Sequence, residues 1–406
     1  MKTLIKLYVD SYRGLSSAAW LLALVILINR TGSMVIPFLG IYMSSALGFS
    51  KTQVGIVLGC FGLGSVVGSW VGGWLTDRLG SYKVQMMSLL LAIPIFLVLP
   101  HFKTFHGLSF MIFILSISTD IFRPANSVAV ARYAKPENIT RAYSLNRMAI
   151  NLGFSIGPAL GGFLATYSYD LIFYGNAFGA ACAAVVLTIF FRKRVAVSTV
   201  EKSKTGHAEI NPTKRNAYTD GLFLIFSLTC FFFSLAFFQL LGTLPLFYKE
   251  IYQLKPDQIG LILGFSGFVI VLFEMILVHW AEHRFKVKQI MFWGTALAGL
   301  SYFMLTLDFG IVWLYFAMFI LSSGEMLTLP FSATVAIHRA SKNNQGAYMG
   351  LNALSFAASH IFTAYLGTYI AEHFGYHTLW FATGFTLVAC SFSYYFIIDK
   401  LLKTKT

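Results

Sequence analysis

A segment that occurs twice constrains the fold of this chain more than any other feature. Residues 141–162 read RAYSLNRMAINLGFSIGPALGG, and residues 346–368 read GAYMGLNALSFAASHIFTAYLGT. The same offset of about 205 residues pairs Gln53 with Gln258, Asp77 with Glu282 and Asp120 with Glu325. In a membrane chain, two like halves are typical of a device that moves one half against the other around a central site. The repeat therefore indicates transport.

The composition places the chain in a membrane. Hydrophobic residues make up 57% of the sequence and charged residues only 11%, whereas a soluble protein carries roughly 25% charged residues. Apolar stretches of about 20 residues, the length that crosses a bilayer core, recur about twelve times. We predict an all-α integral membrane protein with twelve transmembrane helices in two pseudo-symmetric six-helix bundles.

The longest polar stretch lies midway along the chain, at residues 192–218. We interpret it as a cytoplasmic linker between an N-terminal bundle, residues 1–191, and a C-terminal bundle, residues 219–406. The other loops are short, which leaves no room for a soluble enzyme domain. The chain has no G-x-x-x-x-G-K-[ST] phosphate loop, so ATP is not expected to drive it. We expect neither an enzyme nor a cofactor.

The net charge of +14 is explained by topology rather than by a nucleic acid partner. With a cytoplasmic N-terminus, only Lys51, Lys103, Lys249 and Lys255 fall in outer loops. Most other Lys and Arg residues then lie in cytoplasmic loops, which satisfies the positive-inside rule. We predict a multi-pass protein of the bacterial inner membrane, monomeric, with both termini in the cytoplasm. The four cysteines lie far apart inside apolar spans and show no disulfide or metal-ligand spacing.

Two motifs resemble signatures of the major facilitator superfamily. The loop after the second span matches G-x-x-x-D-R-x-G through Gly73, Asp77, Arg78 and Gly80. The fifth span carries a glycine motif similar to that of the drug or metabolite:proton antiporters: Gly153, Gly157, Pro158, Gly161 and Gly162. The resemblance implies the fold of that superfamily and makes these nine residues candidates for a conformational role.

Both motifs have physical interpretations. Asp77 can accept hydrogen bonds from the start of another helix, whose positive dipole end attracts an anion. The candidate partners are the start of the eleventh span, Gly346-Ala347, and the base Arg132, and such a contact would hold the inner face shut. Glycines at every fourth position let two helix backbones approach closely, and Pro158 is expected to bend its helix. The resemblance adds the role of a hinge and seal between the halves.

Charged residues inside the spans are functional candidates, because an ionised side chain at mid-bilayer costs at least about 3 kcal/mol. Arg30 in the first span and Asp120 in the fourth both fall near mid-depth. Arg123 follows Asp120 at i+3, on the same helix face. These three residues are expected to form one cluster, with the Asp120–Arg123 pair as a purely structural alternative.

Three acids are candidates for carrying a proton: Glu325, Asp120 and Glu274, in that order. No basic residue accompanies Glu325 or Glu274 within its own span. An unpaired carboxyl in a low dielectric takes up a proton more readily, which a proton-coupled carrier requires. The candidate substrate-binding residues are Arg30, Arg123, Asn29, Gln239, Asn352 and His360.

The leading functional hypothesis is a proton-coupled secondary transporter that exports a small amphiphilic drug or metabolite in exchange for protons. The alternative is a proton symporter that imports an anionic solute, such as an organic acid, peptide or chelate. Arg30 and Arg123 would then clamp the carboxylate, since arginine offers paired donors that match carboxylate geometry. An intramembrane enzyme is disfavoured, because the sequence carries neither H-E-x-x-H nor G-x-S-x-G.

Overall fold

The computed structural model describes residues 11–32, 34–165, 167–204, 216–254, 256–341 and 343–403, and the regular secondary structure of these residues is helical. Eight of the described helices are long and apolar enough to cross a membrane. The last of them, Gln345–Leu402, holds two predicted spans, because Gly375 adopts φ +81° and breaks its helical course. The fold class predicted from the sequence is confirmed.

The N-terminal half is built from eight α-helices in the described residues. They are α2 (Ser17–Thr31), α3 (Val35–Ile41), α4 (Lys51–Leu79), α5 (Ser81–Val98), α6 (Phe105–Asp120), α7 (Phe122–Tyr133), α8 (Ile139–Ala165) and α9 (Asp170–Lys204). Because α9 continues to Lys204, the first part of the predicted linker is helical. Residues 205–215 of that linker lie outside the described residues.

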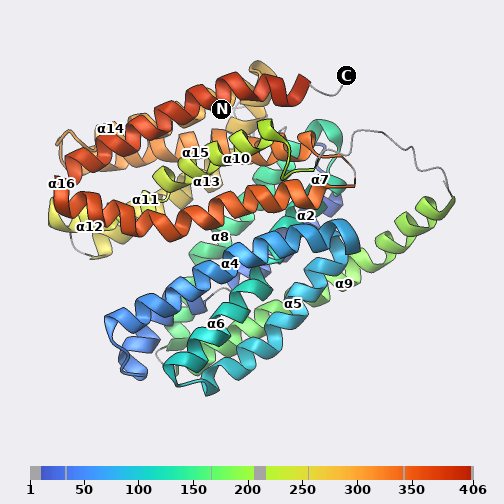
Figure 1. The fold of residues 1–406 in the computed structure, drawn as a ribbon, viewed down its shortest axis with the longest axis horizontal. Coiled ribbons are helices and arrows are strands. Elements are labelled where there is room, and N and C mark those ends of the chain that lie inside the picture. The colour runs from blue at the N-terminus through green and yellow to red at the C-terminus, as the bar shows by residue number, and fades with distance from the viewer. Residues whose placement is uncertain are drawn as a thin grey trace.

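The C-terminal half follows in the same order. Its helices are α10 (Gly221–Phe237), α11 (Gln239–Gly242), α12 (Leu244–Glu250), α13 (Pro256–Arg284), α14 (Val287–Met304), α15 (Ile311–Arg339) and α16 (Gln345–Lys403). Figure 1 shows the two halves as separate bundles, with the N-terminal half below and the C-terminal half above. The division into bundles follows the sequence repeat.

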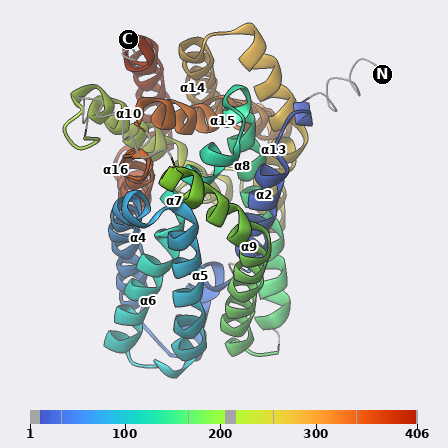
Figure 2. The same ribbon diagram turned by 90° about the vertical axis from the view of Figure 1, so that its right-hand side faces the viewer.

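The two halves meet through the repeated segments. Helix α4 packs on α16, and α13 packs on α8, which is the same pairing twice, because the repeat relates α4 to α13 and α8 to the start of α16. We call the end of the bundle that carries Leu79, Arg284 and Lys204 the linker end. The halves lie closest near this end and diverge toward the opposite end (Figure 1). Figure 2 views the molecule from the linker end.

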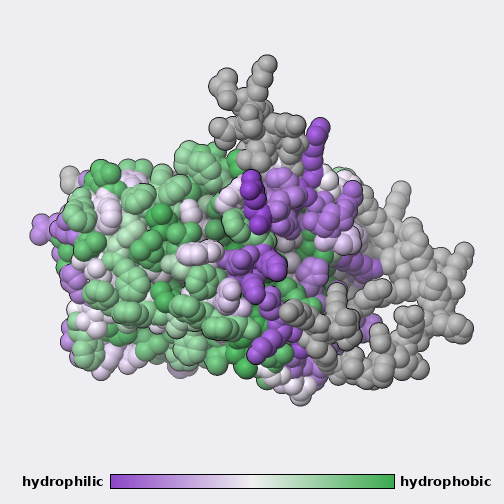
Figure 3. Space-filling model, turned by 90° about the horizontal axis from the view of Figure 1, so that it is seen from above, coloured by the Kyte–Doolittle hydropathy of each residue, from purple (hydrophilic) through white to green (hydrophobic). Residues whose placement is uncertain are grey.

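The surface separates into apolar and polar zones. Large apolar side chains are exposed along the helices, including Phe178, Phe268, Phe385 and Phe396. Figure 3 shows a wide hydrophobic zone on the face seen there, with hydrophilic residues gathered toward the linker end. Exposed apolar surface of this extent is favourable only in contact with lipid. The distribution therefore matches a protein that spans a bilayer.

Candidate functional site

Three spans are interrupted near their middle, and charged or polar residues lie at the interruptions. The first span breaks between α2 and α3, the fourth at Ile121 and the seventh at Phe238. In the fourth span Pro124 has no N–H to donate to the carbonyl of Asp120, four residues earlier. Irregular backbone at membrane depth is tolerated where it is buried in protein or lines a polar space. The breaks therefore mark the region in which a polar site can form.

A cluster of charges occupies this region in the N-terminal half. Nε of Arg123 lies 3.0 Å from Oδ1 of Asp120, which confirms the i,i+3 pair expected from the sequence. Arg30 on α2 is close enough to both residues to interact with their charges, and its guanidinium lies 5.4 Å from the ring centroid of Phe154. Among the described residues, Nε of Arg30 and Oδ2 of Asp120 are buried without a hydrogen-bond partner. The cluster therefore retains unused donor and acceptor capacity.

The C-terminal half contributes His360 to the same place. The His360 ring stacks on Phe238 with 3.7 Å between ring centroids, and it interacts electrostatically with Arg123 and Asp120 across the space between the halves. His360 is exposed, and 35% of the Arg123 side chain is exposed. The cluster therefore faces an accessible space between the halves. We call Arg30, Asp120, Arg123 and His360 the central cluster.

A second cluster joins the halves directly, and it corrects the expectation that Glu274 and Glu325 are unpaired. Arg147 on α8 donates from Nε to Oε1 of Glu274 at 2.8 Å and from Nη1 to Oε1 of Glu325 at 2.6 Å. The two glutamates belong to α13 and α15, so one N-terminal arginine binds two C-terminal acids. We call these three residues the inter-half triad.

The triad lies well inside the membrane region. Arg147 is eight residues from the start of α8, and Glu325 is fourteen residues from the end of α15, or roughly 12 and 21 Å from the linker end at 1.5 Å per residue. The Glu274 side chain is 0% exposed, whereas those of Glu325 and Arg147 are 9% and 13% exposed. Oε2 of Glu274 and Nη2 of Arg147 have no hydrogen-bond partner in the described structure. The triad is therefore buried, with its accessible edge at Glu325 and Arg147.

Arg147 was not among the site residues expected from the sequence. The sequence feature that could have identified Arg147 is the balance of charge between the two halves. The charged positions within the spans hold Arg30, Arg123, Arg147 and Asp120 in the N-terminal half, against Glu274 and Glu325 in the C-terminal half. A surplus of two positive charges in one half faces a surplus of two negative charges in the other. Because unpaired buried charges are unfavourable, that imbalance favours pairing between the halves.

The remaining polar candidates lie in different settings. The Gln239 side chain is buried and bonds to the carbonyl of Thr363 at 3.2 Å and to the hydroxyl of Thr243 at 2.5 Å. These bonds lie within the C-terminal half, so Gln239 stabilises that bundle. Asn29 is half-buried beside Arg30, and Asn352 is buried with Oδ1 unpartnered among the described residues.

The linker end is closed by the contact proposed for Asp77. Its carboxylate accepts hydrogen bonds from the backbone N–H groups of Gly346 at 2.5 Å and Ala347 at 2.7 Å. The backbones of Gly73 and Gly346 touch, since a Cβ on Gly73 would lie 2.6 Å from the Gly346 carbonyl oxygen. We call Gly73, Asp77, Gly346 and Ala347 the linker-end latch. The pseudo-symmetric site pairs Arg141 with Glu282 at 3.7 Å.

The other residues of the first motif act within α4 and its turn. The Arg78 guanidinium lies over the Trp74 ring, 4.1 Å from its centroid. Gly80 adopts φ +84° between α4 and α5, a left-handed conformation that favours glycine. This tight turn sets the end of α4, and with it the position of Asp77.

The fifth-span glycines pack inside the N-terminal half. A Cβ on Gly153 would lie 2.5 Å from that of Arg30, and a Cβ on Gly161 would lie 2.9 Å from that of Met34. Gly162 faces the ring of Phe38. Gly157 is buried and Pro158 is within α8, whose helical course continues to Ala165. The described contacts of these glycines are therefore with α2 and α3 of the same half, and not with the C-terminal half.

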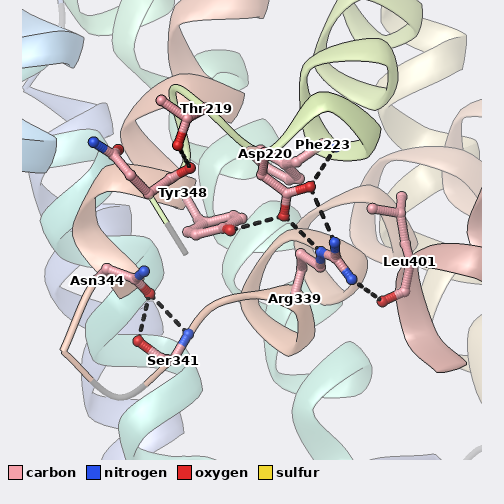
Figure 4. Close-up of polar contacts among 9 residues, drawn as sticks. Thr219, Asp220, Phe223, Arg339, Ser341, Asn344, Tyr348 and Leu401 are labelled. Atoms are coloured by element: carbon pink, nitrogen blue, oxygen red, sulfur yellow. Dashed lines mark hydrogen bonds and ion pairs between the residues drawn. The ribbon is translucent and has the colours of Figure 1, made fainter. Parts of the chain in front are cut away.

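A polar network fixes the start of the C-terminal half at the linker end (Figure 4). Asp220, one residue before α10, accepts from Arg339 Nε at 2.7 Å and from the Tyr348 hydroxyl at 2.9 Å. Arg339 also donates to the carbonyl of Leu401. Burial alone would raise the pKa of Asp220, but hydrogen bonds from Arg339 and Tyr348 outweigh burial and hold it below the ordinary value. The network ties the starts of α10 and α16 to the ends of α15 and α16.

Comparison with known proteins agrees with this architecture. The family model of the Major Facilitator Superfamily matches residues 19–353 and 240–405. The chain therefore belongs to the major facilitator superfamily of secondary transporters, and it is not an enzyme.

Relatives and solved structures match over most of the chain. The uncharacterized MFS-type transporter YttB of Bacillus subtilis is 26% identical, covering 95% of this chain and 96% of that protein. Multidrug resistance protein MdtH of Salmonella typhimurium is 22% identical over 80% of this chain and 79% of its own length. Among solved structures, the human organic anion transporter MFSD10 gives a TM-score of 0.71 at 14% identity, covering 93% of this chain and 98% of its own. A POT family transporter in complex with 5-aminolevulinic acid gives 0.68 at 19% identity, covering 97% and 98%.

Proposed function

We propose that this transporter couples the movement of a small organic compound to a proton, and that the inter-half triad is the coupling site. The observation that supports the proposal is the pair of buried glutamates that share Arg147 across the halves. Adding a proton to one glutamate removes one of the two ion pairs that hold the halves together at this depth. Proton binding and the relative position of the halves are then linked through the same bonds.

Glu325 is the proposed proton carrier, because its side chain is more accessible than the fully buried Glu274. Arg147 holds Glu325 through an ion pair and stabilises its charged form, while Glu274 shares the same guanidinium. The linker-end latch is proposed to keep the cytoplasmic side shut while the opposite side is accessible, so that proton and substrate reach the clusters from outside. This assignment places both termini in the cytoplasm.

Transport in proteoliposomes tests the coupling. A thermal-shift screen of the purified protein against a chemically diverse library first supplies a ligand. In the wild type, accumulation of that ligand should follow an imposed pH gradient, whereas Glu325→Gln should still bind it and lose the response. A Glu325→Gln variant that responds to the gradient like the wild type would overturn the proposal.

Export in exchange for protons is a second candidate, favoured by the MdtH relatives, which are named multidrug resistance proteins. It predicts that cells expressing the wild type retain less of an amphiphilic dye than cells expressing Glu325→Gln. Equal retention across a broad panel of dyes and antibiotics would rule it out.

A further inference from the structure

We propose that the central cluster binds one monoanionic group and that the carrier takes up one proton with each anion, so that a complete cycle moves no net charge. This inference rests on the proton coupling proposed above. It adds the charge class of the substrate and the stoichiometry.

The first argument is the state of Arg30. Its Nε is buried without a hydrogen-bond partner among the described residues, and the guanidinium lies near the Phe154 ring and the charges of Arg123 and Asp120. Asp120 already pairs with Arg123 at 3.0 Å. Two arginines therefore share one acid, which leaves one positive charge uncompensated at an unfavourable depth, and a guanidinium offers paired donors that match a carboxylate. Arg30 is therefore the residue of the central cluster that we assign to anion binding.

The second argument is the summed charge of the central cluster and the inter-half triad, which together we call the charged layer. With His360 neutral, the two arginines and Asp120 of the central cluster sum to +1. Arg147 with Glu274 and Glu325 sums to −1, so the empty carrier is neutral. A proton on the triad leaves +1, and one bound monoanion returns the layer to zero.

The carrier can change its access from one side of the membrane to the other at low cost only when the charged layer sums to zero. An unbalanced charge in a low dielectric is costly. Two occupancies are neutral: the empty carrier without the proton, and the carrier with both the proton and the anion. An anion alone, or a proton alone, leaves one unbalanced charge. The charges therefore favour symport of one proton with one monoanion.

The surroundings of both clusters are consistent with this count. The Tyr302 hydroxyl donates to the carbonyl of Phe237 at 2.9 Å, and Ser144 beside Glu274 is uncharged, so neither adds a charge to the triad. His360 is the titratable group that faces Asp120 and Arg123 from the other half. Near the central cluster, Phe154 is 47% exposed and Phe238 stacks on His360. These rings suit an anion with an apolar or aromatic body, such as an aryl carboxylate.

The binding test compares matched compounds on the purified protein. Benzoate, phenylacetate and hexanoate are compared with their neutral amides and with amines of the same size in thermal-shift titrations. Carboxylates should stabilise the wild type, Arg30→Gln should weaken their affinity at least 10-fold, and Arg30→Lys should retain part of it. Arg284→Gln, at an exposed arginine at the end of α13, is the matched control. Stabilisation by amides or amines but not by carboxylates would overturn the anion site.

The stoichiometry test uses proteoliposomes that hold a fixed pH gradient while potassium and valinomycin set the membrane potential. Steady-state accumulation of a carboxylate that protein-free liposomes do not take up should follow the pH gradient and ignore the potential. One net charge per cycle would instead shift accumulation roughly 50-fold per 100 mV, and such a shift would overturn the one-to-one count. Carboxylate uptake that ignores the pH gradient would overturn the proposed coupling while leaving the anion site intact.

Discussion

At the scale of single residues, Arg147 determines how the two halves are joined inside the membrane. It is the only described basic residue seen bonded to Glu274 or Glu325. Removing one partner of a buried ion pair costs about 3–5 kcal/mol, because it leaves an uncompensated charge. The whole triad can be replaced at much lower cost, because neutral side chains need no counter-charge.

Arg147→Ala should therefore lower the free energy of unfolding by about 3–5 kcal/mol. The triple variant Arg147→Leu, Glu274→Gln, Glu325→Gln should recover most of that loss. Thermal unfolding of the detergent-solubilised proteins measures both. If the single and triple variants lost the same free energy of unfolding, packing rather than charge would stabilise the inter-half triad.

Sequence reasoning identified the Asp120–Arg123 pair, which lies within one helix, and the contact of Asp77 with Gly346-Ala347, which the repeat and the family motif indicated. Asp120 and Arg123 are three residues apart, so helix geometry alone predicts their contact. The partners of Arg147 lie 127 and 178 residues away in sequence, and their contact depends on how two bundles cross. That crossing is set by packing at Gly73, Gly346 and Gly350, which sequence periodicity cannot specify.

At the scale of helices, the closest approach between the halves depends on glycines, which have no side chain to separate the two backbones. Gly73 on α4 lies against the backbone of α16, whereas Gly59 on the same helix has open space where a Cβ would be. Gly73→Ala should therefore prevent closure of the linker end, and Gly59→Ala should leave it unchanged.

Labelling of a buried position measures this closure. Ser144 on α8 is 0% exposed, so Ser144→Cys, in a background without the four native cysteines, reports opening. A water-soluble thiol reagent should react several-fold faster when Gly73→Ala is added, and at an unchanged rate when Gly59→Ala is added. Equal rates in all three proteins would contradict the assignment of Gly73 to the latch.

The start of α10 has a pH dependence of its own. The pKa of Asp220 is lowered from its ordinary value of 3.8, so folding favours the charged carboxylate. This contribution to stability is fully present above the unfolded-state value and is lost as the pH falls through the folded-state value. Asp220→Asn should thus be less stable than the wild type at pH 7, and the difference should shrink below pH 3.8. Thermal unfolding from pH 7 to pH 3 tests it, with Glu372→Gln, at an exposed carboxylate of α16, as the control; a constant difference would contradict the linkage.

At the scale of the whole molecule, the two halves share one arrangement of helices but not one distribution of charge. Both halves use the same crossing, α4 with α16 and α13 with α8. The positions that the repeat relates have nevertheless diverged, since Arg147 corresponds to Asn352 and Gly346 to Arg141. A symmetric scaffold therefore carries an asymmetric layer of charges, and only the folded structure reveals which of them meet.

The neutral-layer argument makes a prediction about when the linker end opens. Spin labels at Lys83 and Lys286, exposed residues of opposite halves at that end, report the distance between the halves. Acidification alone and a carboxylate ligand alone each leave one unbalanced charge, so neither should shift the distance distribution. Both together should shift it to longer distances, because the layer is then neutral and one ion pair of Arg147 is lost.

Glu325→Gln provides the decisive control, since it neutralises one glutamate without a proton. In this variant the carboxylate alone should lengthen the distance at neutral pH, where the wild type needs acid as well. Double electron–electron resonance in lipid nanodiscs measures the distance between the labels in the two proteins under the four combinations of pH and ligand. A wild type that opens on acidification alone, or a variant that still requires acid, would show that the halves do not respond to the summed charge of the two clusters.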